Sequence, residues 1–175
     1  VGVLNRAQNH LKLNEYNATT GAFVKTLFEE KNDKYVEPQH ELTFVPGKQN
    51  EFIWWSQRDG YMHLNLYNTD GKLIRQLTKG NWVVNELISI TNDKLFFTSS
   101  KKSPLEKQFS FVQLKNAQIK DITNASGTHT VSMNHDGTCF YDTYSNDTLP
   151  RIAYLGNVLS GKSDTLLKAK NTLLD

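Results

Sequence analysis

Apolar and polar residues alternate in short runs along almost the whole chain, which is the pattern of β-strands with one buried face. The clearest runs return four times, at intervals of roughly 40 to 50 residues, the repeat length of propeller blades. They occupy residues 11–17, 63–68, 109–114 and 151–157. One such repeat cannot bury both of its faces alone, so we expect the copies to stack. Radial stacking of repeats built only from strands gives a β-propeller.

Each of these runs belongs to a unit of up to four predicted strands. Fourth strands follow a turn and are predicted at residues 23–27, 73–78, 118–123 and 164–167. Second strands are rich in aromatic and β-branched residues, which suit a packed pleated surface, and are predicted at residues 1–6, 51–55, 94–98 and 138–142. First strands are predicted at residues 40–45, 82–90 and 129–133. The opening unit has no first strand, so the chain is expected to start inside a blade.

The turn residues support this organisation, because pairs such as Asp70-Gly71 and Asp136-Gly137 tolerate the positive φ of tight hairpins. The chain is therefore predicted to be all-β, a partial β-propeller of four-stranded antiparallel blades forming one domain over residues 1–175. An incomplete blade covers residues 1–34, and complete blades cover residues 35–80, 81–126 and 127–175.

Strand alternation also predicts which side chains are buried. His63 lies on the face opposite Leu64 and Leu66, where a hydrogen-bonded packing role is favoured over catalysis. Cys139 falls in a predicted inner strand and is expected to be a buried, inert thiol. The residues expected in the packed interior are Leu64, Leu66, Phe96 and Phe140.

Composition excludes several classes of function. The chain has 175 residues and a formal net charge of +2, without a basic cluster, which argues against a nucleic-acid partner. Its single cysteine rules out an internal disulfide. No apolar run in the sequence is long enough to span a membrane.

The sequence offers little chemistry of its own. It contains no Gly-x-Ser-x-Gly elbow, no glycine-rich phosphate loop and no Cys-x-x-Cys pair, so we expect no catalytic residue, no cofactor and no metal in this chain. His129 and His135 could share a blade edge with Asp136 and form a metal site. We favour the simpler interpretation, that they are loop and strand-end histidines. The hairpin that carries Arg58 and Asp59 is either a ligand-contacting loop or a structural turn, and we favour the turn.

Residues 55–84, which begin Trp-Ser-Gln-Arg-Asp-Gly-Tyr-Met-His and continue to Leu-Thr-Lys-Gly-Asn-Trp, resemble the N-terminal β-propeller of the dipeptidyl peptidase IV family. Residues 35–40 and 103–106 are similar to its Bacteroidetes branch, and the resemblance runs over essentially the whole chain. It implies an eight-bladed propeller followed by an α/β-hydrolase domain, in serine exopeptidases that remove X-Pro or X-Ala dipeptides. The chain looks like the C-terminal half of that propeller, an open arc of about half a ring.

The resemblance also bears on the site. It implies a Ser-Asp-His triad downstream of Asp175 and paired glutamates upstream of Val1, so the pair Glu29-Glu30 is not assigned the family's amine-binding role. One element of the site remains within the chain. The loop Tyr35, Val36, Glu37 and Pro38 corresponds to a region that borders the extended substrate pocket in relatives, and these four residues are the substrate-access candidates.

We therefore expect a non-catalytic part of a periplasmic or secreted dipeptidyl peptidase IV-like enzyme. Its expected partners are peptide substrates and the α/β-hydrolase domain of the same polypeptide. Half a ring leaves apolar faces at both ends, so homo-oligomerisation, most simply as a two-fold pair, is also expected. The alternative is a stand-alone propeller domain that binds protein or glycan through loops on one face.

Overall fold

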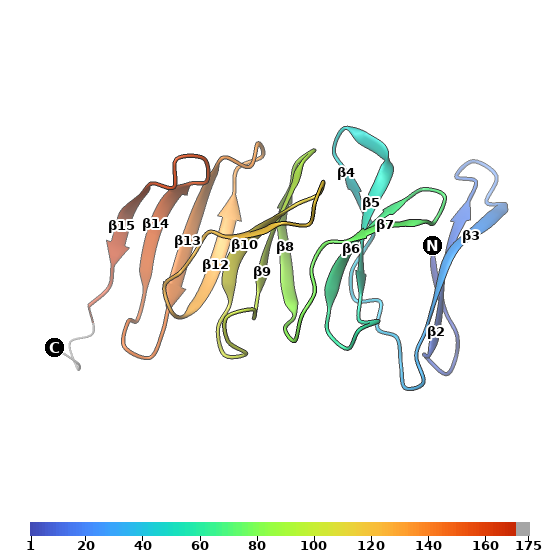
Figure 1. Cartoon of the computed structure of the whole chain (residues 1–175), viewed down its shortest axis with the longest axis horizontal. Helices are drawn as coiled ribbons and strands as arrows, with labels where there is room; N and C mark the ends of the chain where they lie inside the picture. The colour runs from blue at the N-terminus through green and yellow to red at the C-terminus, as the bar shows by residue number, and fades with distance from the viewer. Residues whose placement is uncertain (171–175) are drawn as a thin grey trace. The chain divides into compact units, whose positions relative to one another are not determined.

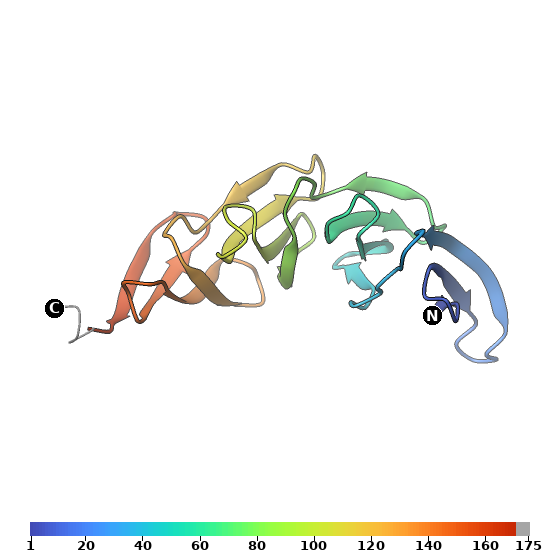
Figure 2. The ribbon, with the colours of Figure 1, turned by 90° about the horizontal axis from the view of Figure 1, so that it is seen from below.

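A computed structural model of the protein describes residues 1–170, and within them fifteen strands form four antiparallel sheets (Figure 1). In every sheet, strands that follow one another in the sequence pair side by side, as Figures 1 and 2 show. This is the meander of a propeller blade, and it confirms the predicted fold class. The chain divides after Lys79 into two compact units, so the predicted single domain consists of two structural parts.

The first unit holds a three-stranded and a four-stranded sheet. The three-stranded sheet comprises β1 (Gly2–Leu4), β2 (His10–Tyr16) and β3 (Phe23–Lys31). The four-stranded sheet comprises β4 (Thr43–Val45), β5 (Lys48–Ser56), β6 (His63–Asn68) and β7 (Leu73–Gln76).

The second unit holds two four-stranded sheets. One comprises β8 (Val84–Ile90), β9 (Lys94–Ser99), β10 (Gln108–Gln113) and β11 (Ile119–Asp121). The other comprises β12 (Thr128–Met133), β13 (Cys139–Ser145), β14 (Ile152–Asn157) and β15 (Ser163–Lys168).

Several strands differ in length from their predictions, and two of these differences lie near the site. Strand β3 continues to Lys31 because β2 keeps pairing with it as far as His10. Strand β4 begins only at Thr43, because His40 leaves the sheet and lays its ring against Trp55 at 3.8 Å between centroids. The segment between these strands therefore belongs to no sheet.

Each unit has its own aromatic core. In the first unit, leucines of β2 pack against Phe52, Trp54 and Tyr67. The core of the second unit consists of Phe96, Phe109, Phe111, Val131 and Phe140. The four predicted core residues are confirmed, with exposed fractions of 0 to 5% for Leu64, Leu66, Phe96 and Phe140. His63 is buried and hydrogen-bonded through Nδ1 to the Thr78 hydroxyl at 3.0 Å, as expected.

The prediction for Cys139 was wrong, because its side chain is exposed. Along β13, Phe140 and Asp142 are buried and their neighbours Cys139 and Tyr141 face outward. Successive side chains of a strand point to opposite faces, so a residue next to the buried Phe140 cannot share its face.

Candidate functional site

The four substrate-access candidates lie in the segment of residues 32–39 that crosses from β3 to β4. Two backbone hydrogen bonds attach this segment to the turn before β2: Asn32 N donates to the Asn9 carbonyl at 3.0 Å, and Val36 N donates to the Gln8 carbonyl at 2.7 Å. Its exit is held where the His40 ring stacks on Trp55. The segment is thus tied at both ends, and Tyr35 between them is 52% exposed.

A hairpin faces this segment. Strand β5 ends at Ser56, and the chain turns through Gln57, Arg58 and Gly60 before β6 begins. Gly60 has a φ of +93° and its N–H donates to the Gln57 carbonyl at 2.8 Å, so the turn needs glycine at this position. The predicted turn is confirmed, and it also forms part of a pocket.

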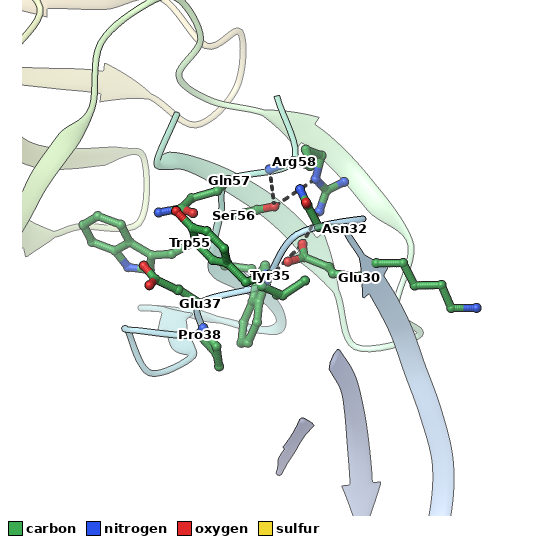
Figure 3. Close-up of a pocket in the computed structure, with 12 residues that line it drawn as sticks. Glu30, Asn32, Tyr35, Glu37, Pro38, Trp55, Ser56, Gln57 and Arg58 are labelled. Carbon is green, nitrogen blue, oxygen red and sulfur yellow. Dashed lines mark hydrogen bonds and ion pairs between the residues drawn. The ribbon is translucent and has the colours of Figure 1, made fainter. Parts of the chain in front are cut away.

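Segment and hairpin together enclose a small pocket and border a larger depression (Figure 3). The pocket has a volume of about 30 Å³, which is enough for about one water molecule. The depression is open and has a volume of about 570 Å³. All four predicted residues line the pocket, together with Glu30, Lys31, Asn32, Trp54, Trp55, Ser56, Gln57 and Arg58.

Arg58 connects the hairpin to the other sheet of this unit. Its Nη2 donates to Oε1 of Glu30 at 2.7 Å and to the Tyr67 hydroxyl at 2.5 Å, and its Nε donates to Oγ of Ser56 at 3.1 Å. Trp54 Nε1 donates to the same Glu30 oxygen at 3.3 Å. Arginine suits this position because its planar fork donates in several directions at once.

Charge and burial shift the pKa values in this network. Burial by itself lowers the pKa of Arg58, but the hydrogen bond to Tyr67 and the charge of Glu30 outweigh it, so the pKa is raised. Burial raises the pKa of the Tyr67 hydroxyl, although the bond to Arg58 acts in the opposite direction. Arg58 therefore stays a cation and Tyr67 a neutral hydroxyl.

The adjacent acids Glu29 and Glu30 point to different surroundings, because neighbouring residues on β3 face opposite ways. Glu29 lies on the surface, where His10, then Lys12 and Lys31, lower its pKa to about 2. Glu30 faces the second sheet and pairs with Arg58. Both carboxylates are already engaged by groups of the protein, in keeping with not assigning them the amine-binding role.

The segment adds one acidic side chain to the pocket, and a histidine lies at its exit. Glu37 is exposed, and its Oε2 accepts a hydrogen bond from Gln39 Nε2 at 2.8 Å. Figure 3 shows Tyr35, Glu37 and Pro38 on one side of the pocket and Gln57 and Arg58 on the other. Partial burial against Trp55 lowers the pKa of His40, which favours its neutral ring. The pocket is thus amphipathic, with aromatic walls and charged groups of both signs.

The histidines considered as metal ligands do not come together. His129 is fully buried within β12, and its Nδ1 lies 2.6 Å from Oδ2 of Asp142, whereas His135 and Asp136 lie on the surface before β13. His129 is thus a strand-end histidine of β12, as expected, although its side chain is buried in the core, and His135 is a loop histidine. Within residues 1–170, no group of three or more His, Cys, Asp or Glu side chains could hold a metal ion, and no helix has the length and apolar content needed to cross a bilayer.

Comparison with protein families decides the relationship. Residues 1–151 match the model of the dipeptidyl peptidase IV (DPP IV) N-terminal region. The chain belongs to the DPP IV N-terminal region family. The match includes the segment at Tyr35 and the hairpin at Arg58, so the whole candidate site lies inside the family region.

Solved structures agree with this DPP IV assignment. A protein of Bacteroides ovatus described as a dipeptidyl aminopeptidase IV is 34% identical, with a TM-score of 0.88 over 97% of this chain and 27% of its own. Dipeptidyl peptidase 4 of Porphyromonas gingivalis is 25% identical, with a TM-score of 0.83 over 96% of this chain and 24% of its own. The predicted resemblance to the bacterial branch is thereby confirmed.

Curated relatives include a protein of Aspergillus terreus described as a dipeptidyl-aminopeptidase B, which is 30% identical over 118 residues. That match covers 61% of this chain and 13% of the relative. The chain therefore corresponds to about a quarter of the solved structures and a smaller part of the curated relatives.

Sequence reasoning located the segment but missed its partners. The favoured interpretation of Arg58 was a structural turn, and Glu30 was considered only for a role that the family places elsewhere. The sequence signals that could have linked the two residues are separate: an acidic residue lies near the end of one strand, and an arginine lies in a hairpin of the next sheet. Their separation of 28 residues hides the pair until the sheets pack.

Proposed function

We propose that this chain is part of the propeller of a DPP IV-like serine exopeptidase, in which it shapes the access of peptide substrates to the catalytic serine. The proposed parent enzyme releases X-Pro or X-Ala dipeptides from peptide N-termini. Such a propeller contributes by exclusion and positioning and breaks no bond itself.

The observation that carries the proposal is the pairing of the Tyr35–Pro38 segment with the Arg58 hairpin around a small pocket, beside an open depression that Tyr35 also lines, inside a chain of this family. An exposed tyrosine offers a flat amphipathic surface to a peptide, and Glu37 beside it adds a negative charge. Lys34 borders the depression from the other end of the segment. Groups of this kind distinguish peptide side chains by size and charge.

A substitution at Glu37 tests the proposal in the full-length enzyme. Glu37→Ala should change the ratio of kcat/KM between dipeptide reporters with charged and neutral N-terminal residues, while thermal unfolding stays the same. Glu41→Ala is the matched control, since Glu41 is exposed and outside the pocket. Equal ratios across the reporter panel in the Glu37 variant would contradict the proposed role.

The chain alone should have no peptidase activity, since its sequence contains no nucleophile elbow. The purified chain is expected not to hydrolyse Gly-Pro or Ala-Pro reporters. Turnover that a serine-directed inhibitor abolishes, and that survives removal of contaminating peptidases, would contradict this expectation.

The remaining parts of the proposal concern the whole protein. We infer a periplasmic or secreted parent in which this chain packs against an α/β-hydrolase domain of the same polypeptide. The parent reading frame should contain a Gly-x-Ser-x-Gly motif and an export signal. A parent reading frame without the motif would favour a stand-alone binding domain.

Self-association is also proposed, supported by exposed apolar side chains such as Val1, Phe23 and Leu166. Light scattering that reports only monomers at micromolar concentration would contradict it.

A further inference from the structure

The small pocket and the open depression share a wall. Lys31, Asn32, Tyr35 and Gln57 line both spaces. The wall therefore consists of the first residues of the 32–39 segment on one side and the hairpin on the other. Because the pocket behind it holds only about one water molecule, the position of this wall determines how deep the depression is.

Arg58 is placed to hold the wall. Glu30 directly precedes the wall residue Lys31, and the guanidinium of Arg58 binds the Glu30 carboxylate at 2.7 Å. The same guanidinium is fixed in its own sheet by Ser56 and by Tyr67, which is 97% buried. The Glu30 side chain is 11% exposed, so the loss of this partner would leave a carboxyl group with little access to water.

The other polar attachments of the segment do not reach the hairpin. Asn32 and Val36 bind the backbone of Asn9 and Gln8, which belong to the first sheet. Near the wall, within residues 1–170, the hydrogen bonds of Glu30 with Arg58 and Trp54 join β3 to the second sheet. The Trp54 bond is longer, at 3.3 Å, and its donor is uncharged.

We propose that Arg58 is a positioning residue that sets the depth of the substrate-facing depression by holding Glu30, and with it the wall at Lys31–Tyr35, against the hairpin. The assignment of the depression to substrates rests on the proposed function, whereas the mechanical role of Arg58 does not. Without this residue the wall separates from the hairpin, the two spaces merge, and the site admits a larger side chain.

The first experiment uses this chain alone and needs no peptidase activity. Trypsin cleaves after lysine, and Lys31 and Lys34 lie in the wall. Arg58→Ala should raise the rate of cleavage after these two residues by about tenfold, the effect of losing a charged hydrogen bond to a nearly buried carboxylate. Arg58→Lys should restore part of the protection, since lysine can pair with Glu30 but cannot reproduce the planar fork.

Controls separate this local change from general unfolding. Arg151→Ala removes an exposed arginine of the second unit and should leave cleavage after Lys31 and Lys34 unchanged. Cleavage after Lys120 in the second unit should also stay the same in every variant. Glu30→Gln keeps the size of the side chain and removes its charge. It weakens the same contact from the other side, so it should also raise cleavage after Lys31 and Lys34, and it replaces Arg58→Ala as the test if that variant does not fold.

The second experiment uses the full-length enzyme. Arg58→Ala should raise kcat/KM for reporters with a bulky N-terminal residue relative to those with a small one, by about tenfold. The change should appear mainly in KM, because the wall lies away from the reacting bond, and Arg58→Lys should reverse part of it.

The two experiments fail in different ways. Unchanged trypsin cleavage in both Arg58→Ala and Glu30→Gln would overturn the role of Arg58 as the residue that holds the wall. Faster cleavage with no change in reporter discrimination would overturn the assignment of the depression to substrates, and with it the proposed function. Faster cleavage together with a size-dependent change in KM is the result that we expect.

Discussion

Arg58 and Glu30 in the first unit, and His129 and Asp142 in the second, are hydrogen-bonded pairs of a base and an acid in different settings. The first pair joins β3 to the hairpin between β5 and β6 of another sheet, beside a pocket, and its side chains are 38% and 11% exposed. The second joins the neighbouring strands β12 and β13 of one sheet, and both side chains are fully buried. The first pair therefore lines a pocket, whereas the second is sealed from solvent.

The sealed pair is hydrogen-bonded on both sides of the imidazole ring. Nδ1 of His129 lies 2.6 Å from Oδ2 of Asp142, and its Nε2 lies 3.0 Å from the Ala125 carbonyl oxygen. Burial, and then the neighbouring Asp142, raise the pKa of Tyr154 on the next strand. The pair thus fixes one sheet internally and has no access to a ligand.

The comparison shows that location decides what a polar pair can do. Taking both charges out of water makes the loss of one partner costly, because the other remains buried without compensation. A pair at the rim of a pocket keeps part of its hydration, so losing one partner costs less.

The largest effect should follow removal of the sealed imidazole. His129→Ala is expected to lower the free energy of unfolding by about 3–5 kcal/mol, since the fully buried Asp142 carboxyl group would lose the imidazole that lies 2.6 Å from it. Urea unfolding of the purified chain measures this loss. His135→Ala removes an exposed histidine and should change the free energy by no more than about 0.5 kcal/mol. A loss below about 1 kcal/mol in the His129 variant would mean that the pair is not the main polar stabiliser of its sheet.

A smaller loss is expected at the rim. Arg58→Ala should lower the free energy of unfolding by about 1–3 kcal/mol, the cost of leaving a mostly buried charged group without its partner. A double-mutant cycle with Glu30→Gln isolates the interaction, because the double variant should lose less than the sum of the two single variants. Additive losses would show that Arg58 stabilises the unit through contacts other than Glu30.

The smallest effect should depend on pH and on His40. Burial lowers its pKa in the folded protein below the usual value of 6.5. As pH falls through about 6.5, the unfolded chain binds a proton before the folded chain does, so this contribution to stability is present above that pH and is lost below it. His40→Phe should keep the stacking on Trp55 and reduce the difference in unfolding free energy between about pH 7.5 and about pH 5.5. An identical pH dependence in both proteins would exclude His40 as a source of it.

The predicted fold was largely correct because its evidence is local. Each strand was recognisable from alternation within a few residues, and hairpins such as the one at Gly60 from the turn residues that they require. The errors arose where a neighbour in the sheet decides the outcome. Cys139 was assigned to the buried face although Phe140 beside it occupies that face, and the burial of His129 against Asp142 on β13 was not predicted.

The site was predictable in part. The resemblance pointed to Tyr35, Val36, Glu37 and Pro38, and these residues do line one pocket. The hairpin residue Arg58 was treated as part of a turn, because its own sequence neighbourhood contains everything that a turn needs. Its decisive partner, Glu30, ends a strand of another sheet and gives no signal in the hairpin itself.

The sequence alone determined the all-β class, the repeated strands, most of the core and the family, because alternation, turn chemistry and motifs are short-range properties of the chain. Only the tertiary structure decided which polar groups meet. The contacts of Arg58 with Glu30 and of His129 with Asp142 close over 28 and 13 residues. They form because packing brings together polar side chains that lie far apart in the sequence, and a polar group that packing removes from water is stable only with a hydrogen-bond partner.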